Sequence, residues 1–114
     1  YNPGRRKAFE TITVTSSLEE AGQDVERETG SRPLTVATGA ALEPPLLTFA
    51  ELEKLIRTGE RPCLILFGTA WGLAKEAVSG ADRRLEPISG VGEYNHLSVR
   101  SAAAIVLDRI RKNL

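Results

Sequence analysis

The sequence predicts an α/β domain with a mainly parallel sheet flanked by helices. Three β-rich apolar runs support this fold class, and helical patterns separate them along the chain; the runs lie at 11–16, 34–38 and 63–67. The run at 63–67, Cys-Leu-Ile-Leu-Phe, is apolar at every position, which is typical of a strand covered on both faces. The run at 11–16 alternates more, so we expect a strand nearer an edge of the sheet.

Helix start signals precede two of the intervening segments. Each signal is a Ser or Thr followed three residues later by Glu, which is the pattern of a capping box; the pairs are Ser17 with Glu20 and Thr48 with Glu51. A glycine follows each of these helical patterns and is expected to end the helix. The predicted helices cover 17–30, 48–59, 72–80 and 98–112. With a short strand near 83–88, these elements predict one domain over residues 1–114.

The composition and the absence of long apolar runs limit the partners, the compartment and the cofactors that we expect. Fifteen basic and fifteen acidic residues give the 114-residue chain a formal net charge of zero, so a nucleic acid would have to be held by a local basic patch. One cysteine excludes an internal disulfide and suits a reducing compartment, so we expect a cytoplasmic protein. We expect no membrane span, because no apolar run approaches roughly 20 residues. We also expect no metal, because one histidine and one cysteine offer no ligand pair at zinc spacing.

The first candidate site is the segment Phe-Gly-Thr-Ala-Trp-Gly-Leu at 67–73, directly after the apolar strand. Ligands of open α/β sheets bind beyond the carboxyl ends of strands, where glycines let backbone amides approach them. The segment lacks the Gly-Lys-Ser/Thr of a phosphate loop and the glycine spacing of a dinucleotide motif. The alternative is a tight β–α turn in which Trp71 packs.

The second candidate site lies between Pro87 and Ser98 and holds the one histidine, His96. Asn95 or Ser98 is equally suited to cap the final helix. A single histidine is more often a hydrogen-bonded structural residue than a catalyst, since histidine chemistry usually needs an orienting partner. Cys63 starts an apolar strand, where burial makes a thiol inert, so we do not expect it to act as a nucleophile.

Together, the segments LILFGTAWGL (64–73) and LEPISGVGEYNHLSVRSAAAIVLDR (85–109) resemble SPOUT-class (SpoU–TrmD) RNA methyltransferases, in their carboxyl-terminal portion. The resemblance is closest to a bacterial family found alone or beside a tRNA guanine-methyltransferase domain. It covers nearly the whole chain and is most specific over 85–105. It implies S-adenosylmethionine as cofactor, a carboxyl-terminal deep trefoil knot, and a homodimer formed through the 98–112 helix.

The resemblance also implies roles for individual residues. The cofactor contacts that it implies are Thr38, Phe67, Gly68, Gly72, Leu73, Pro87, Ile88, Gly90, Asn95, Leu97 and Ser98. His96 and Asn95 are the implied catalytic residues, and His96 stands where the class has an asparagine near the substrate. The main catalytic arginine is expected in an amino-terminal portion that the chain lacks. RNA contacts are expected from Arg5, Arg6 and Arg100.

The function expected from this resemblance is S-adenosylmethionine-dependent methylation of RNA, with tRNA as the substrate. The resemblance favours a ribose 2′-oxygen over a base as the acceptor. The alternative is a non-catalytic knotted module that serves dimerisation or RNA docking, which the zero net charge and the expected missing portion favour for this chain.

Overall fold

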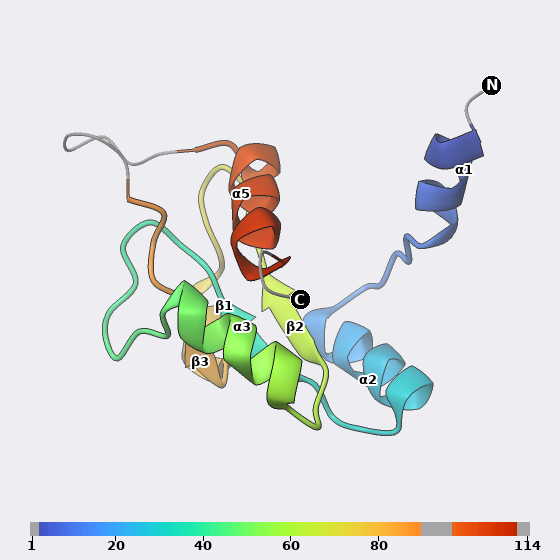
Figure 1. The fold of residues 1–114 in the computed structure, drawn as a ribbon, viewed down its shortest axis with the longest axis horizontal. Coiled ribbons are helices and arrows are strands. Elements are labelled where there is room, and N and C mark those ends of the chain that lie inside the picture. Colours follow the sequence, from blue (N-terminus) through green and yellow to red (C-terminus); the bar gives the residue numbers. More distant parts are fainter. Residues whose placement is uncertain (1–2, 90–96, 112–114) are drawn as a thin grey trace.

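The fold is α/β, as the sequence predicts. The computed structural model describes residues 3–89 and 97–111. The elements are α1 (Pro3–Glu10), α2 (Leu18–Thr29), β1 (Leu34–Ala37), α3 (Phe49–Thr58), β2 (Cys63–Leu66), α4 (Lys75–Gly80), β3 (Arg83–Arg84) and α5 (Val99–Arg111). Figure 1 shows the strands at the centre of the molecule with helices around them.

The sheet has three parallel strands in the order β2-β1-β3. Val36 of the central strand pairs with Ile65 on one side and with Arg83 on the other. An isolated parallel bridge between Leu47 and Leu85 continues the pairing beyond β3. Because β2 lies at an edge of this sheet, only Leu66 of its four residues is buried, and the expected burial of this strand on both faces is wrong.

Helices α3 and α5 pack against each other over one face of the sheet. The buried apolar side chains between them form one cluster: Val36, Leu47, Leu52, Leu85, Val106 and Ile110. These side chains come from β1, from the loop before α3, from α3, from the end of β3 and from α5. Burying apolar surface is the main stabilising contribution to such a core.

The helix ends confirm the predicted caps. Thr48 Oγ1 accepts a hydrogen bond from the Glu51 amide (3.0 Å), and the Glu51 carboxylate accepts one from the Thr48 amide (3.2 Å). Ser17 accepts from the Glu20 amide at 3.1 Å, and Gly30 ends α2 in the left-handed conformation. The α2 box is displaced by one residue, because the Glu20 carboxylate accepts from Ser16 rather than from Ser17.

The strand predicted at 11–16 does not form. Ile12 and Val14 are 60% and 91% exposed, and no strand of the described residues pairs with this segment. β-Branched side chains favour a strand only where a neighbouring strand supplies hydrogen bonds and packing. Instead, Figure 1 shows residues 11–16 as a connection between α2 and α1, a helix that the sequence did not predict and that lies apart from the sheet.

The trefoil knot and the absence of a membrane span are two further expectations from the sequence. The expected knot involves the segment 90–96, which lies outside the described residues. Within 3–89 and 97–111, the helices are all too short or too polar to cross a membrane.

Candidate functional site

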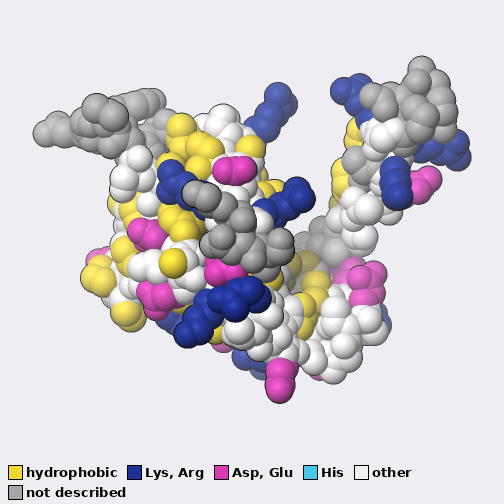
Figure 2. Space-filling view, in the orientation of Figure 1, with side chains coloured by type: hydrophobic (Ala, Val, Ile, Leu, Met, Phe, Trp, Pro, Cys, Tyr) yellow, Lys and Arg dark blue, Asp and Glu magenta, His cyan; other side chains and the backbone are white. Residues whose placement is uncertain are grey.

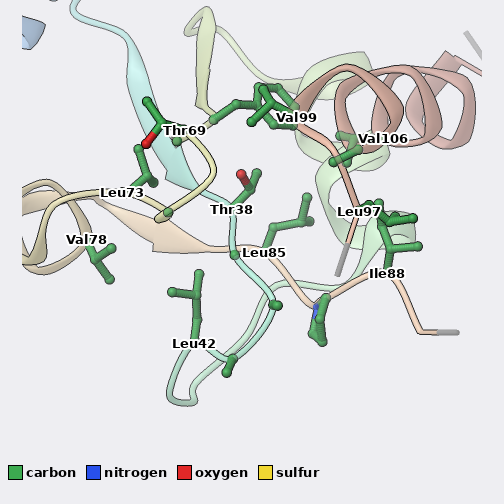
Figure 3. A pocket seen from close by; sticks show the side chains of 18 of the residues that line it. Thr38, Leu42, Thr69, Leu73, Val78, Leu85, Ile88, Leu97, Val99 and Val106 are labelled. Atoms are coloured by element: carbon green, nitrogen blue, oxygen red, sulfur yellow. The ribbon is translucent and has the colours of Figure 1, made fainter. Parts of the chain in front are cut away.

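A cavity of about 510 Å³ opens at the carboxyl ends of the strands (Figure 3). Its walls are the segments that follow β1 (38–42), β2 (67–73) and β3 (85–88), together with the start of α5. The volume falls within the roughly 300–1,000 Å³ that is usual for small-molecule sites. The position agrees with the rule that ligands of parallel sheets bind where the strands end.

The segment after β2 makes a tight, hydrogen-bonded turn. The Gly72 amide donates to the Thr69 carbonyl oxygen (2.9 Å), and the Trp71 amide lies 3.4 Å from Thr69 Oγ1. Gly72 has a φ of 82°, a backbone conformation that residues with a side chain rarely adopt. A Cβ on Gly68 would collide with the backbone of Gly72 and Leu73. Both glycines are therefore needed for this wall of the cavity.

The expected packing role of Trp71 is wrong. Its side chain is 96% exposed at the tip of the turn, although the turn itself lines the cavity. The tight turn that the sequence offered as an alternative is thus present, and the same segment lines the cavity.

Thr38 lies directly after β1 and continues its pairing with β2. Its amide and its hydroxyl both donate to the Leu66 carbonyl oxygen, at 3.2 and 2.6 Å. The hydroxyl proton is thereby committed, and the oxygen keeps lone pairs that can accept a hydrogen bond. Figure 3 shows this side chain in the middle of the cavity wall.

The segment after β3 forms the third wall and connects it to α3. The Leu85 amide donates to the Ala37 carbonyl oxygen (2.9 Å), and the Glu86 amide donates to that of Leu47 (2.8 Å). The Glu86 carboxylate accepts a 2.7 Å hydrogen bond from the Phe49 amide, in the first turn of α3. Glu86 is the one ionisable residue among the described lining residues, so this part of the wall offers no lysine or arginine to a phosphate.

The fourth wall comes from the residues just before α5 and from the first two turns of that helix, where apolar and small side chains meet the cavity: Leu97, Val99, Ala102 and Val106. Ser98 is not a lining residue. Its hydroxyl accepts from the Ser101 amide (3.2 Å) and donates to the Ser101 hydroxyl (3.0 Å), so it caps α5. The interpretation of Ser98 as a cap is confirmed.

Most of the residues that the resemblance assigns to the cofactor line this one cavity: Thr38, Phe67, Gly68, Gly72, Leu73, Pro87, Ile88 and Leu97. Gly90, Asn95 and His96 lie outside the described residues. The wall at 39–42, Gly-Ala-Ala-Leu, was not predicted from the sequence. The signal that could have found it is Gly39, two residues after β1, in the same position relative to β1 that Gly68 has relative to β2.

The residues expected to contact RNA are divided between two places. Arg5 and Arg6 belong to α1, which lies apart from the sheet in Figure 1, and Arg6 is 3.7 Å from Glu10. Arg100 is exposed in the first turn of α5, next to the lining residue Val99. Figure 2 shows one face of the molecule, on which Lys and Arg side chains lie among acidic and apolar ones.

The structure does not support a catalytic role for the Cys63 thiol or for a cluster of metal-ligating side chains among the described residues. Burial raises the pKa of the Cys63 thiol, which keeps it protonated near neutral pH. Among the residues that the structure describes, there is no group of three or more metal-ligating side chains.

Comparisons with known proteins agree with this geometry. The chain is 40% identical over 109 residues to an uncharacterized protein of Aquifex aeolicus (strain VF5), covering 96% of this chain and 53% of that protein. It is 43% identical over 109 residues to a tRNA (guanine-N(1)-)-methyltransferase of Oleidesulfovibrio alaskensis, and 42% identical over 112 residues to one of Nitratidesulfovibrio vulgaris. Each of these two matches covers 96% of this chain and 25% of the relative. The chain thus spans from a quarter to about half of these relatives.

A solved structure, that of a probable methylase family protein from Haemophilus influenzae Rd KW20, has the same fold. The TM-score is 0.78 at 22% identity, over 96% of this chain and 46% of that one. A family model described as SAM-dependent RNA methyltransferase matches residues 1–112. The cavity at the strand ends and this match lead to one conclusion: the chain belongs to the family of S-adenosylmethionine-dependent RNA methyltransferases.

Proposed function

We propose that this chain is the cofactor-binding part of a tRNA methyltransferase and that S-adenosylmethionine, the cofactor of the family, occupies the cavity at the strand ends. The observation that carries this proposal is the cavity itself, because the segments that follow all three strands line it. S-adenosylmethionine has no phosphate and must be held by shape and by backbone hydrogen bonds. A glycine turn without a lysine or arginine among the described lining residues fits that requirement.

The lining residues divide the work of binding. The turn from Gly68 to Leu73 brings backbone close to the ligand, and Thr38 Oγ1 offers an acceptor. Ile88 and Leu97 supply apolar surface for a purine. The bound cofactor supplies an electrophilic methyl group. The protein contributes by fixing donor and acceptor in line, and such positioning can supply much of a rate acceleration.

We further propose that the acceptor is a base rather than the ribose 2′-oxygen favoured by the sequence. The names of two relatives support this change, since both are tRNA (guanine-N(1)-)-methyltransferases. Methylating a ring nitrogen requires removal of its proton, and a histidine or amide beside the acceptor is suited to assist. Asn95 and His96, outside the described residues, remain the proposed catalytic pair.

The proposed partners are tRNA and a second copy of the chain, in the cytoplasm. Arg100 in the first turn of α5 is the proposed RNA contact nearest the cavity, with Arg5 and Arg6 as further contacts. The proposed homodimer forms through the 98–112 helix. Leu107, which is 48% exposed on α5, supports this proposal because a large apolar side chain is suited to an interface.

The test uses Leu73→Arg, which places a cation in the cavity wall, in the complete protein that contains this chain. Calorimetry with S-adenosylhomocysteine and methyl transfer from labelled cofactor to bulk tRNA are measured. We expect at least a tenfold loss of cofactor affinity and of transfer, because the long guanidinium side chain would occupy space in the cavity and replace an apolar lining side chain with a cation. Leu18→Arg, at a partly exposed position on α2, is the matched control and should leave both unchanged.

This comparison also shows which part of a longer protein carries the reaction. Unchanged transfer by Leu73→Arg would place methylation outside this chain and favour a docking role. The acceptor is identified by digesting the product tRNA to nucleosides and locating the methyl group by mass spectrometry. A methyl group on ribose would overturn the base assignment while leaving the cofactor assignment intact.

A further inference from the structure

Trp71 is the one tryptophan of the chain, and its ring faces solvent. It is 96% exposed, the highest value among the exposed large apolar side chains of the described residues. A tryptophan is highly buried on average, so nearly complete exposure is unusual. The packing of the fold does not account for it.

The backbone that carries this ring forms a hydrogen-bonded turn. The Gly72 amide closes the turn onto the Thr69 carbonyl oxygen, and a bridge pairs the same two residues. Gly68 packs directly against the far end of the turn. The position of the ring's attachment is therefore fixed before any ligand arrives, which lowers the entropy lost on binding.

The neighbours of Trp71 leave its ring accessible. Ala70 and Gly72 are small and exposed, and Thr69 is exposed and polar. The ring is thus a single aromatic surface rather than the centre of a broad apolar patch. A stable protein–protein interface needs roughly 800 Å² from each partner, whereas a planar ring by itself matches the face of a nucleobase.

The turn also has a suitable location. Residues 67–73, including Trp71, line the cavity at which the methyl donor is proposed to bind, and Figure 3 shows Thr69 and Leu73 in this wall. The methyl acceptor must come into line with the donor, so the acceptor nucleotide has to reach the opening of this cavity. Proteins that act on bases and proteins that read single-stranded RNA stack the exposed base on an aromatic side chain.

We propose that the indole ring of Trp71 stacks on an unstacked base of the RNA substrate, at the methylated nucleotide or directly beside it. This inference rests on the proposed RNA methyltransferase function and adds a positioning residue to it. Removing a stacking aromatic weakens single-strand binding by about 5- to 150-fold. The effect is expected in RNA affinity and in the KM for RNA, and it should exceed any change in cofactor affinity.

The test compares Trp71→Leu, which keeps an apolar side chain but removes the ring, with Trp71→Phe, which keeps an aromatic face. In the complete protein, we expect Trp71→Leu to lose at least fivefold in affinity for fluorescently labelled tRNA and Trp71→Phe to retain most of it. S-adenosylhomocysteine affinity, measured by calorimetry, should change less than tRNA affinity in Trp71→Leu, because the ring is almost fully exposed to solvent. Val14→Leu, at an equally exposed position away from the sheet, is the control and should bind tRNA like wild type.

Intrinsic fluorescence supplies an independent measurement. The difference in emission between wild type and Trp71→Phe isolates the Trp71 signal, which should be quenched as tRNA is added. Wild-type affinity in Trp71→Leu, or an absent quench while wild type binds tRNA, would overturn the stacking proposal alone. The Trp71 emission could instead change on protein dilution, in parallel with a fall in molecular mass, and not respond to tRNA. That result would show that a second copy of the chain covers the ring, and it would overturn the stacking proposal. Failure of wild type to bind or methylate RNA would overturn the proposed function and the stacking together.

Discussion

Asp82 and Thr35 exchange three hydrogen bonds where β1 and β3 begin to pair. The Asp82 carboxylate accepts from the Thr35 amide (2.9 Å) and hydroxyl (3.1 Å), and the same hydroxyl accepts from the Asp82 amide (2.9 Å). Arg61 lies 3.9 Å from the carboxylate and donates to the carbonyl oxygens of Arg32 and Pro33. These contacts hold the amino ends of the strands, opposite the cavity.

The Asp82 carboxylate predicts an acid-sensitive contribution to stability. The hydrogen bond from the Thr35 amide, above all, lowers the pKa of Asp82 in the folded state. The unfolded value is about 3.9, so the stabilisation is complete above that pH and is lost as the pH falls through the folded pKa. We expect Asp82→Asn to cost about 1 kcal/mol at pH 7, because solvent screens this partly exposed group.

Urea unfolding of wild type and Asp82→Asn between pH 3 and 7 measures this contribution. The free-energy difference between the two proteins should shrink below about pH 4. Glu60→Gln, in the turn before β2, serves as the surface-carboxylate control and should have the same free energy of unfolding as wild type at pH 7. A difference between wild type and Asp82→Asn that stays constant over the whole range would refute the assignment.

The glycine turn predicts a strong dependence of cofactor binding on two backbone positions. Gly68→Ala would drive a Cβ into the backbone of Gly72 and Leu73, and Gly72→Ala would place a side chain at a φ of 82°. The strain at Gly72 is about 1–2 kcal/mol, and that at Gly68 is larger because backbone must move. Calorimetry should show at least a tenfold loss of S-adenosylhomocysteine affinity for Gly68→Ala.

Gly80→Ala supplies the matched control for the turn. Gly80 is the last residue of α4, and an added Cβ there meets nothing within 4 Å. We expect unchanged cofactor affinity and a melting temperature equal to or slightly above that of wild type, since alanine has a higher helix propensity than glycine. Equal effects of alanine at positions 68 and 80 would contradict the importance of the turn.

The packing of α3 predicts that Leu52 is among the most important apolar side chains for stability. Leu52 points from α3 into the core cluster and is fully buried there. Leu52→Ala should lower the free energy of unfolding by about 2–5 kcal/mol through lost burial and the cavity left behind. Val14→Ala, at a 91% exposed position, should change it by less than about 0.5 kcal/mol. Chemical denaturation followed by far-ultraviolet circular dichroism measures both.

Cys63 predicts a slow reaction with thiol reagents. Burial raises the pKa of its thiol, so the reactive thiolate is scarce near neutral pH. At pH 7.5 the folded protein should react with a disulfide reagent at least tenfold more slowly than the protein unfolded in urea. Rapid labelling of the folded state, with retained circular dichroism, would contradict this description of the strand.

Local signals in the sequence predicted those elements that depend on a few neighbouring residues. The capping box at Thr48 and the glycine after α2 act within one helical turn, so their pattern determines the helix ends. The segment 11–16 has the β-branched composition of a strand, but composition supplies no partner, and the described sheet offers none. The edge position of β2 follows from sheet order, which a strand's own residues do not encode.

The candidate site shows the same division. The turn from Gly68 to Gly72 was predictable because its glycines meet a local backbone requirement. The sequence offers Ser98 as a helix cap and as a cofactor contact, and the hydrogen bond from the Ser101 amide confirms the cap. The wall at 39–42 and the exposure of Trp71 depend on where three separate strand ends meet, so only the tertiary structure reveals them.

The central place of β1 in the sheet has a consequence for synthesis on the ribosome. β1 can pair with β2 once residue 66 has emerged, but its other edge waits for β3 at 83–84. The core is closed later still, because Val106 and Ile110 cover it from α5. Until then the nascent chain exposes Leu47 and Leu52, so α5 has to emerge before the apolar face of β1 is protected from association with other chains.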